Sequence, residues 1–187
     1  LAEVLLQQGK STEGEKLLRG SLEGMRRVLG PEHPKTLEAE SWLAPILAGQ
    51  KKFDEAEAMF RHHWDASGRV LGIDHPNTLN AMTNLGWLLA YRNELIAATK
   101  LFRENAEALR RTRGAEHIAA ITIGNALANL LLLQGEYVEA EQLARQNSAA
   151  AQKVLGAVHT ETAFAVFIVD ASLLAQRRAI EEEAYGQ

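Results

Sequence analysis

Histidines recur at a constant spacing along the sequence, and their side chains could bind a metal ion. The recurring set is His33, His75, His117 and His159, and a local cluster is formed by His62, His63 and Asp65. Imidazole and carboxylate groups are common zinc ligands, but zinc requires each nitrogen within about 2.1 Å. Neighbouring helices pack roughly 8–10 Å apart, so the histidines in the turns of successive repeats cannot share one ion. We therefore predict turn and capping roles for the recurring histidines, and no bound metal or cofactor.

The sequence contains none of the common catalytic motifs. It has no glycine-rich phosphate loop, no nucleophile elbow, no His-Glu-x-x-His motif and no cysteine. Its formal net charge of −4 is unlike that of most nucleic-acid-binding proteins, and no apolar run reaches the roughly 18 residues needed to cross a membrane. We predict a protein with no catalytic residues that binds neither nucleic acid nor membranes. The missing cysteines favour a cytoplasmic location.

A repeat of 42 residues determines where the histidines fall. The segment Leu-Gly-Pro-Glu-His-Pro-Lys-Thr-Leu at 29–37 returns as Leu-Gly-Ile-Asp-His-Pro-Asn-Thr-Leu at 71–79. Glycine also recurs three residues before each later histidine, as Gly114 and Gly156. Glycine suits the end of a helix, and proline suits the first turn of the next. The motif therefore predicts a helix end followed by a helix start.

A second turn lies half a period away, at Gln50-Lys51-Lys52 and Gln134-Gly135-Glu136. The segments that follow it have apolar residues at i, i+3, i+4 and i+7, as amphipathic helices do. Each repeat is thus predicted to contain a helix A and a helix B. The expected repeats are 1–33, 34–75, 76–117, 118–159 and a partial 160–187, with an incomplete helix B beyond Gln176. We interpret 1–187 as a single repeat domain and a fragment of a longer chain.

Helix pairs at this spacing, with Leu-Gly-x-x-His-Pro-x-Thr-Leu turns, resemble tetratricopeptide repeats of the 42-residue kinesin light chain type. Leu85, Gly86 and Leu89 match packing positions of helix A in that family, and Ala56 and Phe60 match those of helix B. The resemblance covers the whole chain. It implies an all-α, right-handed superhelical solenoid of antiparallel helix pairs, about four and a half repeats long, with a concave surface lined by the A helices.

By this resemblance, one set of positions on the A helices forms a peptide-binding groove. The expected groove residues are Ser41, Asn80, Thr83, Trp87, Tyr91, Thr122, Asn125 and Asn129. Asparagine carboxamides both donate and accept, so they suit a peptide backbone, and aromatic side chains suit an apolar anchor. Packing between helices is the alternative role for the asparagines and for Trp87. Because Glu3 and Glu38 also face inward, we expect a neutral or mildly basic, partly aromatic peptide.

The resemblance leaves two interpretations of function open. The first is a non-catalytic scaffold that binds an extended protein or peptide segment. The second is a structural or sensor arm of a larger signalling ATPase or kinase, in which similar arrays occur. In that case the arm associates through its terminal faces, including self-association through the terminal helix. That helix contains the apolar residues Phe164, Val166, Phe167, Ile168, Leu173 and Leu174.

A polar column on the B helices also has two interpretations. Its members are Ser21, His63, Asn105 and Asn147, at positions where the family usually has a small apolar residue. A hydrogen-bonded ladder between repeats is one role for this column, and holding a ligand is the other.

Overall fold

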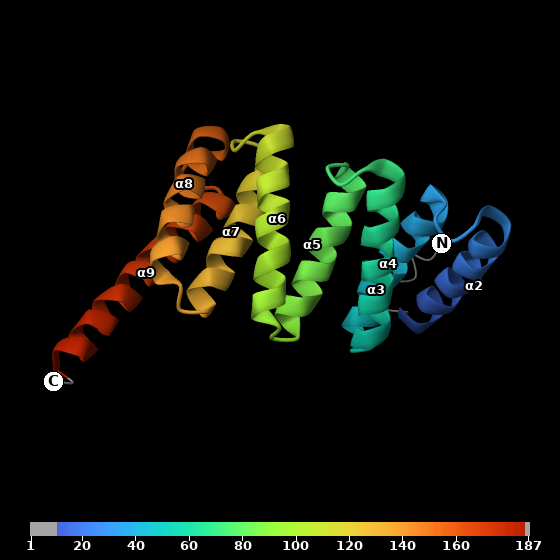
Figure 1. The fold of residues 1–187 in the computed structure, drawn as a ribbon, viewed down its shortest axis with the longest axis horizontal. Helices are drawn as coiled ribbons and strands as arrows, with labels where there is room; N and C mark the ends of the chain where they lie inside the picture. The colour runs from blue at the N-terminus through green and yellow to red at the C-terminus, as the bar shows by residue number, and fades with distance from the viewer. Residues whose placement is uncertain (1–10, 186–187) are drawn as a thin grey trace. The chain divides into compact units, whose positions relative to one another are not determined.

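A computed structural model of the chain describes residues 11–185, which form α-helices joined by short turns (Figure 1). The helices are α2 (Ser11–Leu29), α3 (Pro34–Gly49), α4 (Phe53–Leu71), α5 (Pro76–Tyr91), α6 (Leu95–Arg113), α7 (Ile118–Leu133), α8 (Tyr137–Leu155) and α9 (Thr160–Tyr185). Glu3 lies outside the described residues. The A helices α3, α5, α7 and α9 begin at 42-residue intervals, and so do the B helices α4, α6 and α8. The prediction of an all-α solenoid of helix pairs is confirmed.

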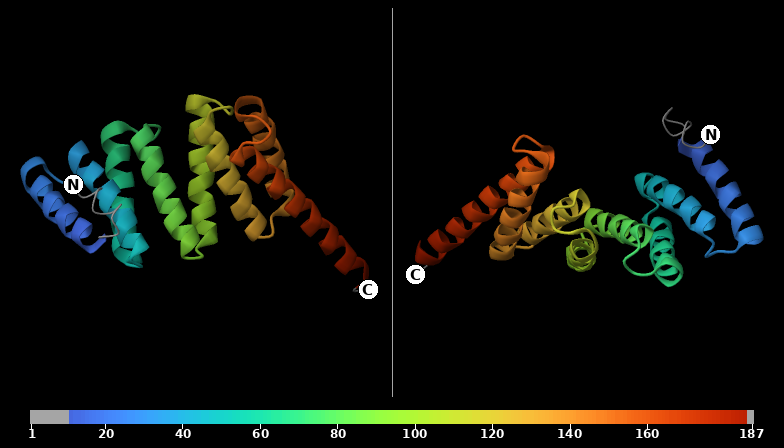
Figure 2. Two further views of the ribbon diagram at one scale, coloured as in Figure 1. Left: turned by 180° about the vertical axis from the view of Figure 1, so that it is seen from behind. Right: turned by 90° about the horizontal axis from the view of Figure 1, so that it is seen from above.

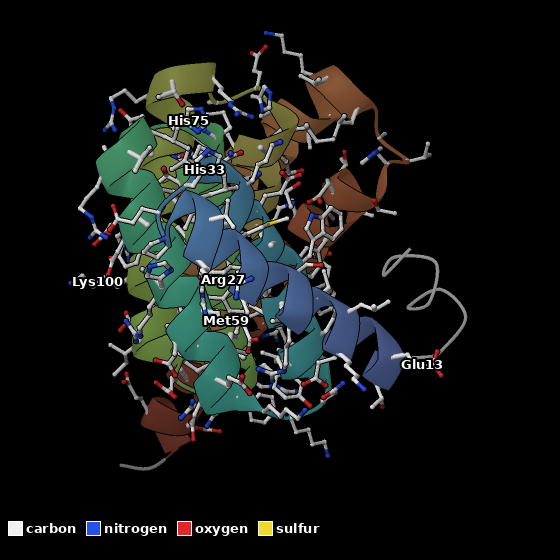
Figure 3. The ribbon with its side chains drawn as sticks, turned by 90° about the vertical axis from the view of Figure 1, so that its right-hand side faces the viewer. Glu13, Arg27, His33, Met59, His75 and Lys100 are labelled. Atoms are coloured by element: carbon white, nitrogen blue, oxygen red, sulfur yellow. The ribbon has the colours of Figure 1, made fainter. Side chains whose placement is uncertain are left out.

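Each turn from helix B to helix A is held by its glycine and histidine. The glycines at 30, 72, 114 and 156 have φ between +86° and +96°, a region that side chains disfavour. Three residues later, the histidine Nδ1 accepts from the backbone N–H two positions on, at 3.2 Å in all four turns. His33 and His75, labelled in the upper part of Figure 3, each directly precede the first residue of a helix A. The turn and capping role predicted for the histidines is confirmed.

A threonine reinforces the same turn in three of the four repeats. Thr36, Thr78 and Thr162 are buried, and each Oγ1 donates to the carbonyl of the glycine six residues earlier, at 2.8 Å. The hydroxyl thus bonds a carbonyl at the end of one helix from the start of the next. This contact fixes the angle at which helix A follows helix B.

The turn from helix A to helix B requires one residue with positive φ. That residue is Lys51 (φ 63°), Asn93 (φ 64°) or Gly135 (φ 84°), again at 42-residue spacing. The next N–H then donates to a carbonyl five residues back, at 2.9 Å in each case. Only glycine adopts this conformation without steric cost, and asparagine tolerates it better than lysine does.

Helix α9 differs from the expectation that helix A ends near Gln176. It continues without a break to Tyr185, and both views in Figure 2 show its last part extending away from α8. Arg177 occupies the position that has positive φ in the other repeats. Arginine and the alanines and glutamates that follow are good helix formers, so nothing in this sequence favours a turn.

The chain divides into two compact units, Leu1–Leu88 and Leu89–Gln187, and the boundary falls within α5. The core of the first unit includes Leu22, Leu43, Leu47 and Phe60, and that of the second includes Phe102, Ile121, Leu131 and Ile168. All of these side chains are at most 3% exposed. Burial of such side chains is the main stabilising contribution in stacked repeats.

An ionic network joins α2 to α4 in the first unit. The buried carboxylate of Glu15 accepts from Lys52 Nζ at 2.9 Å and from Arg19 Nε at 2.9 Å. Arg19 also bonds both carboxylate oxygens of Glu55. The Lys52 ammonium, together with Arg19, lowers the pKa of Glu15 to about 2. An analogous pair, Arg103 and Glu139, joins α6 to α8.

Candidate functional site

A cavity of about 630 Å³ opens between α3, α4 and α5, within the first unit. Its volume lies within the range of ligand-binding pockets. The residues that line it, called here the α3–α5 groove, are Pro34, Lys35, Leu37, Glu38, Ser41, Trp42, His63, Ser67, Leu71, Asn77, Asn80, Thr83 and Asn84. Three of the predicted groove residues, Ser41, Asn80 and Thr83, are brought together here.

Neutral hydrogen-bonding side chains dominate this lining. Asn77, Asn80 and Asn84 lie at i, i+3 and i+7 on α5, which places them on one helical face. The Ser41 hydroxyl donates to the carbonyl of Glu38 at 2.7 Å, so its oxygen presents an acceptor. Carboxamides and hydroxyl oxygens of this kind can pair with the N–H and C=O groups of an extended peptide.

An aromatic wall and two opposite charges complete the lining. Trp42 is 52% exposed beside the groove, and an indole in this setting can bury an apolar group. Lys35 and Glu38, both on α3, contribute one positive and one negative charge. The groove therefore has no strong charge preference of its own.

Trp42, Asn77 and Asn84 were not among the groove residues predicted from the sequence, although they line the cavity. The prediction used the helix A positions that the resemblance places on the concave surface, and Trp42 lies one position away from one of them, Ser41. The i, i+3, i+7 spacing of Asn77, Asn80 and Asn84 was the signal available to find the other two.

Trp87 and Tyr91 are exposed on α5, by 49% and 71% respectively. Thr83 lies one turn before Trp87 on the same helix, and its hydroxyl donates to the carbonyl of Leu79 at 2.9 Å. Trp87 and Tyr91 are not among the residues that line the α3–α5 groove. Their role as aromatic anchors stays a prediction.

Thr122 and Asn125 are bonded to the start of α9, within the second unit. Asn125 is 1% exposed, and its Nδ2 donates to the carbonyl of Glu161 at 3.0 Å and to the carboxylate at 2.8 Å. Thr122 Oγ1 donates to the other carboxylate oxygen at 2.9 Å. Asn129 is half-buried on the same helix. The geometry of Thr122 and Asn125 is that of packing between helices, and peptide contact by these three residues stays a prediction.

The polar column of the B helices does not have one structural role throughout. Ser21 is exposed, whereas His63, Asn105 and Asn147 are buried. Asn147 Oδ1 accepts from Arg110 Nη2 at 3.1 Å. His63 instead lines the α3–α5 groove.

The adjacent histidines of α4 face different neighbours. His62 Nδ1 lies 2.7 Å from the buried carboxylate of Glu40, which also accepts from Arg26 Nη2 at 2.7 Å. Asp65 is exposed. Among residues 11–185, no three histidine or acidic side chains are placed so as to hold a metal ion. The same residues include no helix long and apolar enough to span a bilayer.

Known proteins match this chain in sequence family and in fold. A tetratricopeptide repeat model matches residues 1–63 and 36–111, and a second model with the same description matches residues 121–161. No curated protein matches the sequence.

Several solved structures have the same fold. Two are crystal structures, one of them of a point variant, of nearly identical TPR-like repeats from a Podosopora anserina protein named for kinesin light chain. They have TM-scores of 0.84 and 0.83 at 21% identity, covering 98% of this chain and 86% or 87% of the other. Another is BtubC (BKLC) of P. vanneervenii, with a TM-score of 0.75 at 17% identity, covering 99% and 78%. Because one family model matches more than half of the sequence, this chain belongs to the tetratricopeptide repeat family.

Proposed function

We propose that this protein is a non-catalytic scaffold that binds an extended segment of a partner protein in the α3–α5 groove. Tetratricopeptide repeats generally serve as protein-interaction scaffolds and are typically non-catalytic. The observation that supports peptide binding in this groove is the cavity of about 630 Å³, most of whose lining side chains are neutral and polar and which includes one exposed tryptophan. Its lining residues lie on three helices, so the site is preorganised.

Each part of the groove suits a different part of a peptide. The amides of Asn77, Asn80 and Asn84 match backbone N–H and C=O groups whatever side chains the peptide has. Trp42 supplies the aromatic surface for an apolar anchor, the kind of contact from which protein interfaces gain most of their affinity. Lys35 and Glu38 balance each other, which supports a neutral or mildly charged partner rather than a poly-acidic one.

The test is a displayed-peptide selection against the full chain, with a Trp42→Ala/Asn80→Ala variant in parallel. Both side chains are exposed, so the variant is expected to fold. A matched control is Ile96→Ala/Gln152→Ala, which removes one exposed apolar and one exposed amide side chain in the second unit. We expect peptides that bind the wild type and the control and bind the groove variant about tenfold more weakly or worse. Equal binding to all three proteins would refute the proposal.

A second candidate function is that of an arm of a larger signalling ATPase or kinase, associating through terminal faces. The exposed apolar side chains of α9 favour it. Phe164, Val166, Phe167, Leu173 and Leu174 are between 39% and 58% exposed, whereas Ile168 is buried. The rings of Phe164 and Phe167 stack with centroids 6.4 Å apart.

Sedimentation of the full chain tests self-association through α9. We expect the wild type to associate at high concentration and a Phe167→Ser/Leu174→Ser variant to remain monomeric. A wild type that is monomeric throughout, or a variant that associates equally, would contradict this second candidate. For either function we propose a cytoplasmic location, supported by the cysteine-free composition.

A further inference from the structure

Two buried polar atoms lie at the floor of the α3–α5 groove. His63 and Ser67, one turn apart on α4, are 6% and 1% exposed, and both line the cavity. His63 Nδ1 and Ser67 Oγ have no hydrogen-bond partner within the described residues 11–185. More than nine in ten buried polar groups in folded proteins have such a partner. Two unpartnered atoms at the floor of one groove therefore require an explanation.

The equivalent place in the second unit shows how the chain satisfies such a position elsewhere. Two repeats later, Asn147 replaces His63, and its Oδ1 is satisfied by Arg110 Nη2. Ala151 replaces Ser67 and has no polar side-chain atom. Asn147 Nδ2 has no hydrogen-bond partner within the described residues. The second unit thus supplies a partner for one atom at the position of His63 and has no polar side chain at the position of Ser67.

Glu40 explains why His63 lacks the corresponding arginine. Arg26 stands in the same sequence relation to His63 as Arg110 does to Asn147, 37 residues earlier. Its guanidinium is instead bonded to the buried carboxylate of Glu40. The residue of the second unit that corresponds to Glu40 is Gly124, which has no side chain to bond Arg110. The Glu40 carboxylate thus diverts the partner that His63 would otherwise have.

The chemistry of the floor is uncharged. Burial lowers the pKa of the His63 imidazole below its ordinary value, so the ring is neutral at neutral pH. A neutral imidazole and a hydroxyl each supply donor or acceptor capacity. A charged side chain would lose its hydration there, and the neighbouring Glu40 carboxylate is already bonded to Arg26 and His62. A carboxamide has a donor and an acceptor on one rigid group, so it can satisfy both atoms together.

We propose that the floor of the α3–α5 groove is a subsite for one carboxamide side chain, Asn or Gln, of the bound segment, held by His63 and Ser67. This inference rests on the proposed function and names what the partner must contain. Both atoms are covered by protein atoms, so the carboxamide engages them after a change of side-chain rotamer. Trp42 and the asparagines of α5 then bind the flanking residues.

The test measures the affinity of a selected peptide whose positions are replaced one at a time by Asn, Gln, Asp and Leu. We expect one position at which Asn or Gln binds about tenfold more tightly than Asp or Leu. The preference should disappear in Ser67→Ala and in His63→Phe, which removes both ring nitrogens. Ser67→Ala is compatible with the fold because Ala151 occupies the equivalent position and is buried. The matched control is Ser172→Ala, another buried serine whose Oγ lacks a hydrogen-bond partner in the described chain, but on α9.

A second arm does not depend on finding a peptide. Capped asparagine, aspartate and leucine are titrated into the full chain at millimolar concentration, with the imidazole resonances of His63 as the reporter. Only capped asparagine should shift them.

The outcomes separate the two proposals. Peptides that bind without an Asn or Gln preference, or Ser67→Ala behaving like Ser172→Ala, would overturn the subsite and leave the peptide-binding groove intact. No peptide binding together with a selective asparagine shift would support the subsite and refute the extended groove. A failure of both arms would overturn both proposals.

Discussion

The side-chain amide of Asn125 bonds both the backbone carbonyl and the carboxylate of Glu161, at 3.0 and 2.8 Å. These bonds join α7 to the first turn of α9. The equivalent pair two repeats earlier is Ser41 and Asn77, and both of these residues line an open cavity. One pair of repeat positions thus makes a bridge in one unit and forms the wall of a groove in the other.

Removing the bridge should destabilise the second unit. We expect Asn125→Ala to lower the free energy of unfolding by about 1–3 kcal/mol, because the Glu161 carboxylate and carbonyl lose a buried donor. Amide hydrogen exchange should increase most over the first two turns of α9. The control is Asn129→Ala, one turn further along α7, for which we expect a change within about 0.5 kcal/mol. Equal exchange in the two variants would show that the Asn125 bonds do not stabilise α9.

Transferring the bridge to the first unit should close the α3–α5 groove. The variant Glu38→Thr/Ser41→Asn/Asn77→Glu installs the residues of Thr122, Asn125 and Glu161 at the equivalent positions. We expect this variant to keep its helical circular dichroism and to lose affinity for selected peptides by about tenfold or more, since the new amide and hydroxyl on α3 would then donate to the new carboxylate on α5 and bridge the groove. A crystal structure that shows an open groove, or undiminished affinity, would contradict this expectation.

Gly124 is required because Asn147 occupies the space beside it. A Cβ at position 124 would lie 2.6 Å from Asn147 Nδ2 and 2.7 Å from Oδ1. We therefore expect Gly124→Ala to cost about 1–3 kcal/mol through overpacking. Gly20 is also inside a helix, but a Cβ there meets nothing within 4 Å, and Gly20→Ala should stabilise by about 0.5–1 kcal/mol. Urea denaturation of both variants measures this contrast, and a similar effect at the two sites would refute it.

Lys51 has a conformational cost that Gly135 avoids at the same turn. Its φ of 63° is unfavourable for a residue with a Cβ. We expect Lys51→Gly to raise the free energy of unfolding by about 0.5–1 kcal/mol and Gly135→Ala to lower it by about 1 kcal/mol. Asn93→Gly should have a smaller effect, because asparagine tolerates this conformation. Thermal unfolding of the three variants checks the order, which would be wrong if Lys51→Gly were destabilising.

Acid should weaken the attachment of α2 to α4. The pKa of Glu15 is about 2 in the native state, against 4.5 for the unperturbed carboxyl. Above pH 4.5 the carboxylate is ionised in both states and its bonds to Lys52 and Arg19 stabilise the fold. That contribution is lost as pH falls from about 4.5 to 2, because the unfolded state takes up the proton first.

The matched variant is Glu15→Gln, which keeps the shape and removes the charge. Because Lys52 and Arg19 are partly exposed, we expect it to be about 1–2 kcal/mol less stable than the wild type at about pH 7. The difference should shrink towards zero near pH 2. Urea unfolding at several pH values measures it, and a difference independent of pH would rule out the Glu15 carboxylate as its source.

The repeat, the helix pairs and the turns could all be predicted from the sequence. Gly30 and His33 act within a few residues of one another, and local conformational preferences are visible in a local pattern. The same reasoning explains why α9 was expected to end near Gln176 and does not. The expectation followed the period, whereas Arg177 has no preference for the positive φ that the turn requires.

Which polar residues are hydrogen-bonded and which line a cavity could not be predicted from the sequence, because it depends on how the repeats pack. Ser41 and Asn125 occupy the same column, and nothing near either residue predicts their difference. It depends on Glu161 and Asn77, which are 36 residues further along and come into contact only when the repeats stack. In the same way, His63 and Asn147 differ because Glu40 binds Arg26 in one unit and Gly124 leaves Arg110 available in the other. A repeat period predicts positions, but hydrogen-bond partners depend on side chains from neighbouring repeats, so the site emerges only from their packing.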